Sequence, residues 1–339
     1  HTMLETAKPD VVIVTTVDCF HDVYVIAAME AGCDVIVEKP LTTTFEKALA
    51  IQEAKERTKR NITVTFNLRF HPFFSRVKQM VASGILGDIL SVHYEWMLGV
   101  EHGADYFRRW HAERKNSGSL LVHKSTHHFD IANWLLEQDP VSVHAFGTRR
   151  VFGAGREKHA ERCLTCPYKK ECSFYFDIEQ GDVKKLYYDC EGEDGYYRDR
   201  CVFGERIDIE DSVSVSVLYS GGTVMSYSLT AYSPYEGMRI VLNGTKGRME
   251  ATNFGNHVKI ITHRGEEYKI DLPPERGADH GGADGNLEDC VFGGREPELA
   301  SQMADMRAGM MSIGIGMAAN LSMKEGRRVN LSEYYKELR

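Results

Sequence analysis

Three short runs of β-branched residues near the start of the chain constrain its fold more than any other feature. The runs 11–16 (VVIVTT), 34–37 (DVIV) and 61–66 (NITVTF) are separated by helical patterns at 21–31 and 45–58. Apolar runs without polar alternation are typical of strands that are buried on both faces of a parallel sheet. Strands that alternate with helices of this length predict βαβ units, and therefore an open, doubly wound α/β sheet.

The pattern of strands changes beyond residue 87. Residues 213–219 alternate apolar and polar side chains, a glycine-containing hairpin turn follows at 220–222, and an extended run returns at 223–230. Further strands are expected at 89–97, 238–242, 247–251 and 258–262. This spacing predicts a large, mostly antiparallel sheet in an α+β domain.

The chain is therefore predicted to hold two domains. Residues 1–86 form the doubly wound parallel part. Residues 87–339 form the second part, which ends in closing helices between 286 and 321.

Charge and cysteine content limit the possible partners and compartments. The chain has 49 acidic and 41 basic side chains, a formal charge of -8, and no broad basic surface is expected. Nucleic acid is therefore not an expected partner. No apolar run approaches the roughly 18 residues that cross a bilayer, and no signal-peptide pattern is present, so no membrane partner is expected. Eight cysteines in 339 residues are too few for a disulfide scaffold, which favours a cytoplasmic location.

Polar side chains follow each of the three parallel strands. In doubly wound sheets, ligands bind at the carboxyl ends of the strands. The predicted strand ends carry Thr15 and Thr16, then Glu38 and Lys39, and then Asn67 and Arg69. We therefore expect a binding site at this edge of the sheet.

A second group of polar side chains follows Gly118. If the segment is one helix, then His123, His127 and Asp130 have the spacing i, i+4, i+7 and share a face, with Lys124 and His128 beside them. Unpaired buried charges are costly, so this face favours a pocket for a polar ligand. The alternative is an amphipathic helix with a solvated polar side.

These motifs together resemble the glucose-fructose oxidoreductase and inositol dehydrogenase family, called Gfo/Idh/MocA. The resemblance rests on the Glu38-Lys39-Pro40 triplet, the strand end that leads to His21, and the His127-x-x-Asp130 helix, and it spans nearly the whole chain in order. It implies a Rossmann domain that binds NAD or NADP, and an α/β domain that binds the substrate and often forms a homodimer or homotetramer. The residues that it places at the cofactor are Thr15, Thr16, His21, Glu38, Lys39 and Asn67.

The chain departs from the family pattern in two places. The G-x-G-x-x-G fingerprint is absent, because the sequence begins where the family has already used its first strands. We therefore expect this sequence to be part of a longer chain. In the helix, the family commonly has Asp-x-Gly-x-His, whereas here His123 stands where that aspartate is expected.

Oxidation of a secondary alcohol requires that the hydroxyl proton be removed as the hydride leaves. A histidine titrates near neutral pH, so we assign this role to His127, oriented by Asp130 or by a neighbouring hydroxyl. Lys39 would hold and polarise the substrate oxygen. His123 would be a second acid/base group, a substrate contact or a structural residue. The remaining substrate-binding candidates are Arg69, Trp110, Lys124, His128 and His280.

A separate cysteine motif lies in the second half of the chain. Cys163, Cys166 and Cys172 have the spacing Cys-x2-Cys-x5-Cys, and Cys190 and Cys201 follow. With Cys190 as the fourth ligand, the motif predicts a structural zinc site or iron–sulfur cluster. Free thiols or a disulfide are the alternative.

Three functions therefore remain open. The leading hypothesis is an NAD(P)-dependent oxidoreductase that acts on a secondary hydroxyl of a sugar, cyclitol or sugar derivative. A redox-neutral enzyme that uses tightly bound NAD to cleave a glycoside is the first alternative, suggested by His123 and the aromatic insertion 187–203. The second alternative is a sugar-binding protein without catalysis.

Overall fold

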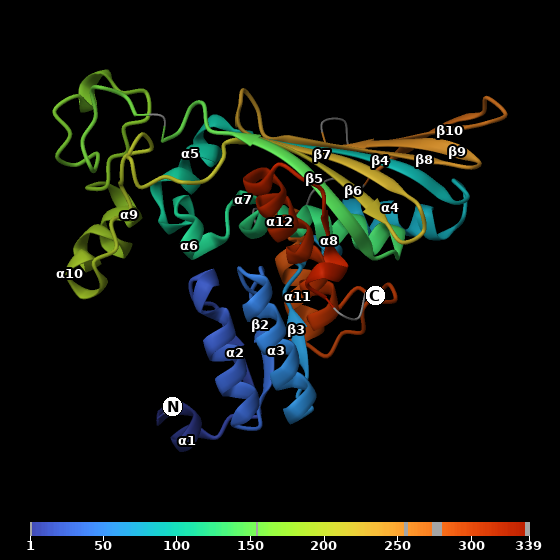
Figure 1. The fold of residues 1–339 in the computed structure, drawn as a ribbon, viewed down its shortest axis with the longest axis horizontal. Coiled ribbons are helices and arrows are strands. Elements are labelled where there is room, and N and C mark those ends of the chain that lie inside the picture. Colours follow the sequence, from blue (N-terminus) through green and yellow to red (C-terminus); the bar gives the residue numbers. More distant parts are fainter. Residues whose placement is uncertain (1, 154, 254–256, 273–279, 336–339) are drawn as a thin grey trace.

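The computed structural model describes residues 2–153, 155–253, 257–272 and 280–335. The chain forms two sheets, a small one at one end and a large one at the other, with helices packed between them (Figure 1). The predicted fold class, a partial doubly wound parallel sheet followed by an α/β part with a large sheet, is confirmed.

The small sheet has the strand order β1-β2-β3-β12. Its first three strands, β1 (Val11–Val14), β2 (Asp34–Val37) and β3 (Ile62–Val64), are parallel. The helices α2 (His21–Glu30) and α3 (Phe45–Thr58) connect them. β12 (Ala304–Asp305) pairs antiparallel with β3, so a segment from late in the chain completes this sheet.

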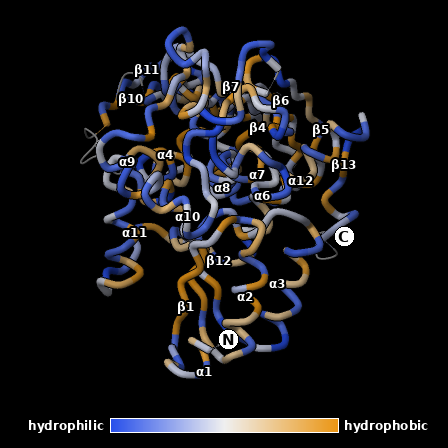
Figure 2. Tube along the Cα trace, turned by 90° about the vertical axis from the view of Figure 1, so that its left-hand side faces the viewer, coloured by the Kyte–Doolittle hydropathy of each residue, from blue (hydrophilic) through white to orange (hydrophobic). Residues whose placement is uncertain are grey.

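The two inner strands of the small sheet are buried, whereas β1 at its edge is not. Val35 and Val37 of β2 are almost fully buried, because helices and neighbouring strands cover them. Val11 and Ile13 of β1 are 45% and 53% exposed, and Figure 2 shows β1 as an apolar segment at the margin of the molecule. The sheet therefore presents an apolar edge on this side.

The large sheet has nine strands in the order β11-β10-β9-β8-β4-β7-β6-β5-β13. The central pair, β4 and β7, is parallel, and the other neighbours are antiparallel. The strand bounds are β4 (Ile89–Gly99), β5 (Pro140–Thr148), β6 (Ser212–Tyr219), β7 (Val224–Ser233), β8 (Gly237–Gly244), β9 (Gly247–Thr252), β10 (His257–Thr262), β11 (Glu267–Asp271) and β13 (Val329–Asn330).

Helices cover one face of the large sheet. α7 (Leu120–His123), α8 (Ser125–Leu136) and α12 (Met306–Glu325) lie between the two sheets (Figure 1). α12 approaches α7 closely at Gly316, where an added Cβ would lie 2.4 Å from the Leu121 carbonyl oxygen. The remaining helices are α1 (Thr2–Ala7), α4 (Pro72–Ala82), α5 (Val100–Arg108), α6 (Arg114–Ser117), α9 (Gly181–Leu186), α10 (Glu191–Asp194) and α11 (Ala283–Val291).

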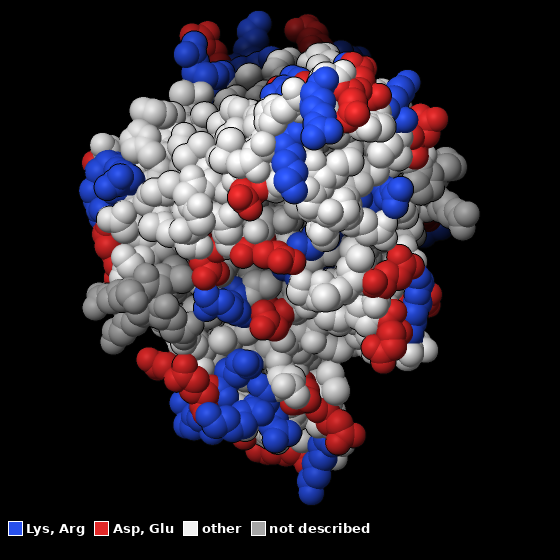
Figure 3. All heavy atoms as spheres, turned by 90° about the vertical axis from the view of Figure 1, so that its right-hand side faces the viewer, with Lys and Arg blue, Asp and Glu red and all other residues white. Residues whose placement is uncertain are grey.

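The surface carries charges of both signs. Figure 3 shows Lys and Arg interspersed with Asp and Glu over the face that it displays, with uncharged atoms over much of the centre. In the described part of the chain, no helix combines the length and the apolar character that crossing a membrane requires.

Candidate functional site

A cavity of about 510 Å³ opens where the carboxyl ends of the parallel strands face α8 and α11. This is the edge of the sheet at which the sequence predicted a site. The wall contains both polar and apolar side chains: Ile13, Ile36, Glu38, Lys39, Thr65, Asn67, His102, Tyr106, Lys124, His127, His280, Asp284, Leu287, Glu288, Val291 and Phe292. Lys39 and His127, which lie 88 positions apart in the sequence, therefore share one cavity.

His127 carries a ring nitrogen with no partner. The side chain is 7% exposed, and its buried Nδ1 makes no hydrogen bond in the described structure. Burial lowers the pKa of His127 well below its usual value, and the charges of Lys39 and Lys124 lower it further. The imidazole is therefore neutral near pH 7 and can accept a proton.

The predicted single helix is broken at Lys124. α7 ends at His123 and α8 begins at Ser125, with Lys124 between them. The His123 ring bonds to two other residues: its Nδ1 lies 2.6 Å from the Asp18 carboxylate, and its Nε2 lies 3.5 Å from the Lys39 ammonium. The predicted single helix is thus two helices, with His123 on α7 and with His127 and Asp130 on α8.

Asp130 binds Arg69 rather than His127. Both Asp130 oxygens accept hydrogen bonds from Arg69, from Nε at 2.8 Å and from Nη2 at 2.7 Å. Both side chains are buried, and neither lines the cavity. Burial raises the pKa of Asp130, and the Arg69 charge opposes that rise. The roles expected for Asp130 as an orienting carboxylate and for Arg69 as a substrate ligand are therefore not supported by this geometry.

Two other substrate candidates lie away from the cavity. His128 is fully buried, stacks on Trp96 with ring centroids 3.9 Å apart, and bonds through Nδ1 to the Tyr227 hydroxyl. Trp110 stacks on His111 at 3.7 Å and is not part of the cavity wall. His128 was expected beside Lys124 on a ligand-binding strip, but its neighbours are core aromatic rings.

Another part of the cavity wall holds a small hydrogen-bonded group. Asn67 donates to Asp284 at 2.6 Å, and His280 Nδ1 lies 2.8 Å from the other Asp284 oxygen. Glu38, next to it, accepts a hydrogen bond of 2.6 Å from the Thr65 hydroxyl. The sequence had indicated Asn67, Glu38 and His280, but it had missed Asp284 and Thr65.

The other predicted cofactor ligands do not line the cavity. Both ring nitrogens of His21 lie close to backbone carbonyls, of Pro40 at 2.8 Å and of Thr16 at 3.0 Å, and the side chain is fully buried. His21 therefore ties the loops after β1 and β2 together. Thr15 and Thr16 are exposed at the carboxyl end of β1.

Four cysteines border one small cavity, but the predicted fourth ligand is not among them. Cys163, Cys166, Cys172 and Cys201 line this space, whereas Cys190 is exposed and its thiol donates to the Lys185 carbonyl. Across residues 2–153, 155–253, 257–272 and 280–335, no group of three or more His, Cys, Asp or Glu side chains is arranged to hold a metal ion. The predicted set with Cys190 was therefore wrong, because its residues do not meet.

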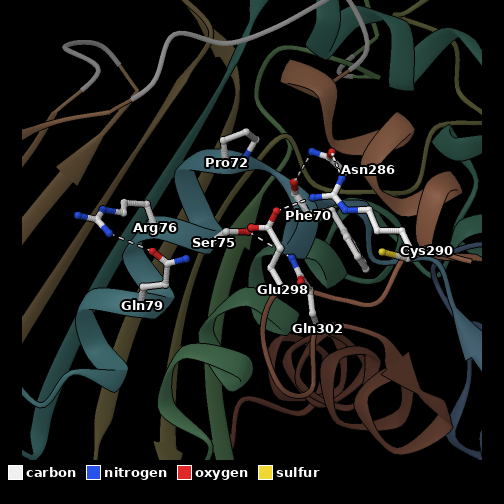
Figure 4. A pocket seen from close by; sticks show the side chains of 10 residues that line it. Phe70, Pro72, Ser75, Arg76, Gln79, Asn286, Cys290, Glu298 and Gln302 are labelled. Carbon is white, nitrogen blue, oxygen red and sulfur yellow. Dashed lines mark hydrogen bonds and ion pairs between the residues drawn. The ribbon is translucent and has the colours of Figure 1, made fainter.

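A second cavity, of about 260 Å³, lies between α4 and α11 (Figure 4). Its polar groups already bond to one another: Asn286 donates to the Phe70 carbonyl, and Gln302 donates to the Ser75 hydroxyl. It therefore offers a ligand fewer free polar groups than the cavity that contains Lys39 and His127.

Comparison with known proteins gives matches along both parts of the chain. Residues 1–66 match the model described as "Oxidoreductase family, NAD-binding Rossmann fold", and residues 78–331 match "Oxidoreductase family, C-terminal alpha/beta domain". The chain is 35% identical to the putative oxidoreductase YteT of Bacillus subtilis, over 98% of this chain and 84% of that protein.

Two further proteins are similar over most of their length. The chain is 24% identical to scyllo-inositol 2-dehydrogenase (NAD(+)) of Bacillus subtilis, over 97% of this chain and 80% of that protein. An inositol dehydrogenase homologue of Azotobacter vinelandii, solved with NAD+, has a TM-score of 0.64 and 18% identity, and the match covers 95% of this chain and 78% of that one. The Azotobacter vinelandii protein therefore shares the fold of this chain.

Proposed function

Because the chain belongs to the Gfo/Idh/MocA oxidoreductase family, we propose that it is an NAD- or NADP-dependent dehydrogenase that oxidises a secondary hydroxyl of a sugar, cyclitol or sugar derivative. The observation that carries the proposal is the shared cavity of Lys39 and His127. An ammonium and a neutral imidazole in one cavity are the two groups that alcohol oxidation needs, since one holds the oxygen and the other takes its proton.

The cavity fits the nicotinamide end of a dinucleotide. It lies at the carboxyl ends of parallel strands and combines an apolar wall at Ile13 and Ile36 with polar groups at Glu38 and Asn67. The unpaired Nδ1 of His127 is a buried polar atom that a ligand would satisfy. When bound, the nucleotide supplies the hydride acceptor.

The chain's own residues would bind the substrate, stabilise its oxygen and accept its proton. Lys39 donates an N–H to the substrate oxygen and stabilises the negative charge that develops there. His127 accepts the hydroxyl proton, and burial keeps its imidazole neutral until then. Lys124, Asn67 and His280 offer donors around the cavity for the other hydroxyls of a polyol.

The test is turnover of a polyol panel by the full-length protein with NAD and with NADP. We expect reduced nucleotide to form with at least one polyol, and Lys39→Met to lower kcat by on the order of 100-fold while nucleotide binding persists. Ser83→Ala is the control, because Ser83 lies at the end of α4, outside the cavity. Cleavage of a glycoside without net nucleotide reduction would contradict a dehydrogenase, and so would the absence of both turnover and nucleotide binding.

We also propose that the protein forms a homodimer or homotetramer through the uncovered face of the large sheet. Phe146, Leu218 and Val224 are large exposed apolar side chains on this face. Leu90 and Val141 are exposed at irregular positions of β4 and β5. Such a group of exposed apolar side chains is typical of an interface. Light scattering after gel filtration should give a multiple of the mass of the single chain, which is 38.4 kDa for these 339 residues, and a monomer would contradict the proposal.

A further inference from the structure

We propose that Asp18 is a positioning residue that acts through His123 to hold the Lys39 ammonium in the cavity. This inference deepens the proposed dehydrogenase function and rests on it. Asp18 begins the short 3₁₀ turn Asp18–Phe20 after β1, and no role was predicted for it from the sequence. It is 3% exposed and lies 105 positions from His123.

The proton on His123 can be placed from the donor capacity of its neighbours. The Lys39 ammonium has only donors, and its Nζ lies 3.5 Å from His123 Nε2, so Nε2 must be the acceptor. Burial lowers the pKa of His123 well below its usual value, and the imidazole is neutral. Its single proton therefore sits on Nδ1, which donates to Asp18 Oδ2 at 2.6 Å.

His123 provides two of the acceptors that surround the ammonium. Lys39 Nζ lies 3.5 Å from His123 Nε2 and also 3.5 Å from the His123 carbonyl oxygen. An ammonium has three N–H donors, so one donor is left for the cavity. The direction of that third donor follows from the position of the His123 ring.

Aromatic rings and Asp18 together fix that ring. Tyr106, Trp110 and His111 surround it, with ring centroids 5.7, 5.4 and 4.2 Å from that of His123. Packing limits the tilt of the ring, while the Asp18 bond selects its rotation and its tautomer. Burial raises the pKa of Asp18, and the Lys39 charge opposes that rise. An ionised Asp18 that accepts the Nδ1 proton at 2.6 Å holds the neutral imidazole with Nε2 unprotonated and beside Lys39.

A double-mutant cycle tests whether Asp18 acts through His123. Asp18→Asn keeps the shape but can bond Nδ1 as either donor or acceptor, so the tautomer is no longer enforced. We expect kcat/KM to fall by on the order of 100-fold, because small misplacements of a catalytic group have effects of that size. In a His123→Gln background, the glutamine amide reaches Lys39 without Asp18, and Asp18→Asn should cause no further loss. Losses that multiply would overturn the proposal.

A matched pair at position 123 makes the test independent of any change at Asp18. His123→Gln extends an amide to the place of Nε2, beside Lys39, whereas His123→Asn reaches only the place of Nδ1, beside Asp18. We expect the glutamine variant to retain more activity than the asparagine variant. The reverse order would overturn the proposal. Asp22→Asn is the control, since Asp22 bonds Lys47 and should leave kcat/KM near that of the wild type.

A readout without turnover separates this inference from the proposed function. In protein labelled with ¹⁵N-histidine, the His123 signals, assigned by their loss in His123→Gln, should show a protonated Nδ1 and an unprotonated Nε2. Asp18→Asn should move the Nδ1 proton upfield, because a charge-assisted hydrogen bond is replaced by a weaker one. Unchanged His123 signals would overturn the link to Asp18. Absence of nucleotide-dependent turnover in the wild type would instead overturn the dehydrogenase function.

Discussion

Replacing Asp130 by asparagine tests whether this carboxylate supports the fold or the chemistry. The two hydrogen bonds from Arg69 are 2.8 and 2.7 Å long, and the side chains are 5% and 1% exposed. Removing one partner of a buried ion pair costs about 3–5 kcal/mol, because the other charge is left buried. Asparagine keeps one acceptor for Arg69, so we expect a loss near the lower value, about 3 kcal/mol.

Urea unfolding followed by tryptophan fluorescence measures this loss. Trp134 is a local reporter, because the Arg69 guanidinium lies 5.7 Å from its ring centroid. With a slope near 3 kcal/mol per molar urea, the midpoint should fall by roughly 1 M. The control is Asp139→Asn, which removes the partner of Arg307 in a pair whose side chains are 38% and 46% exposed. Its loss should stay below about 1 kcal/mol.

The outcome would also decide between two roles for Asp130. If Asp130→Asn has wild-type stability but a much lower kcat, the carboxylate acts in the reaction and the structural reasoning fails. Replacing both partners, as Arg69→Met with Asp130→Leu, should recover part of the stability lost in Asp130→Asn, because no unpaired charge remains. A double variant less stable than the single one would refute that reasoning.

Two further predictions concern packing and pH. Gly103→Ala should lower the melting temperature, because an added Cβ would lie 1.8 Å from the Ala231 carbonyl oxygen. Overpacking of this kind costs typically about 1–3 kcal/mol. Gly192→Ala is the control and should leave the melting temperature unchanged, because an added Cβ there meets no atom within 4 Å. Burial lowers the pKa values of His123 and His127, so the unfolded chain binds protons that the folded one does not, and stability should be lost as the pH falls below about 6.5. Urea titrations between about pH 8 and about pH 5 measure this, and an unfolding free energy that does not fall there would contradict the neutral imidazoles.

Much of the architecture could be predicted because it is encoded locally. The apolar, β-branched side chains of the runs 11–16 and 34–37 predict buried parallel strands. The first predicted range contains β1, and the second has the same bounds as β2. The position of Lys39 at a strand end also follows from local pattern, since it comes directly after such a run. Helix α3 was predicted with its exact bounds, Phe45–Thr58, for the same reason.

The partners of polar side chains could not be predicted in this way. Helical spacing suggested that His123 and Asp130 act together with His127, but a break at Lys124 and two long-range partners separate them. Asp18, which bonds His123, lies far away in the sequence and carries no motif of its own. The cysteine spacing likewise favoured Cys190, whereas the fold brings Cys201 to the other three.

The sequence alone determined the alternating strands and helices of residues 11–66, and that ammonium and imidazole groups follow in the order of an oxidoreductase family. The tertiary structure alone decided which polar groups meet: Lys39 with His123, His123 with Asp18, and Asp130 with Arg69. The physical reason is that secondary structure depends on side chains a few positions apart. The protonation and direction of a buried polar group depend instead on neighbours that only the packed fold brings into contact with it.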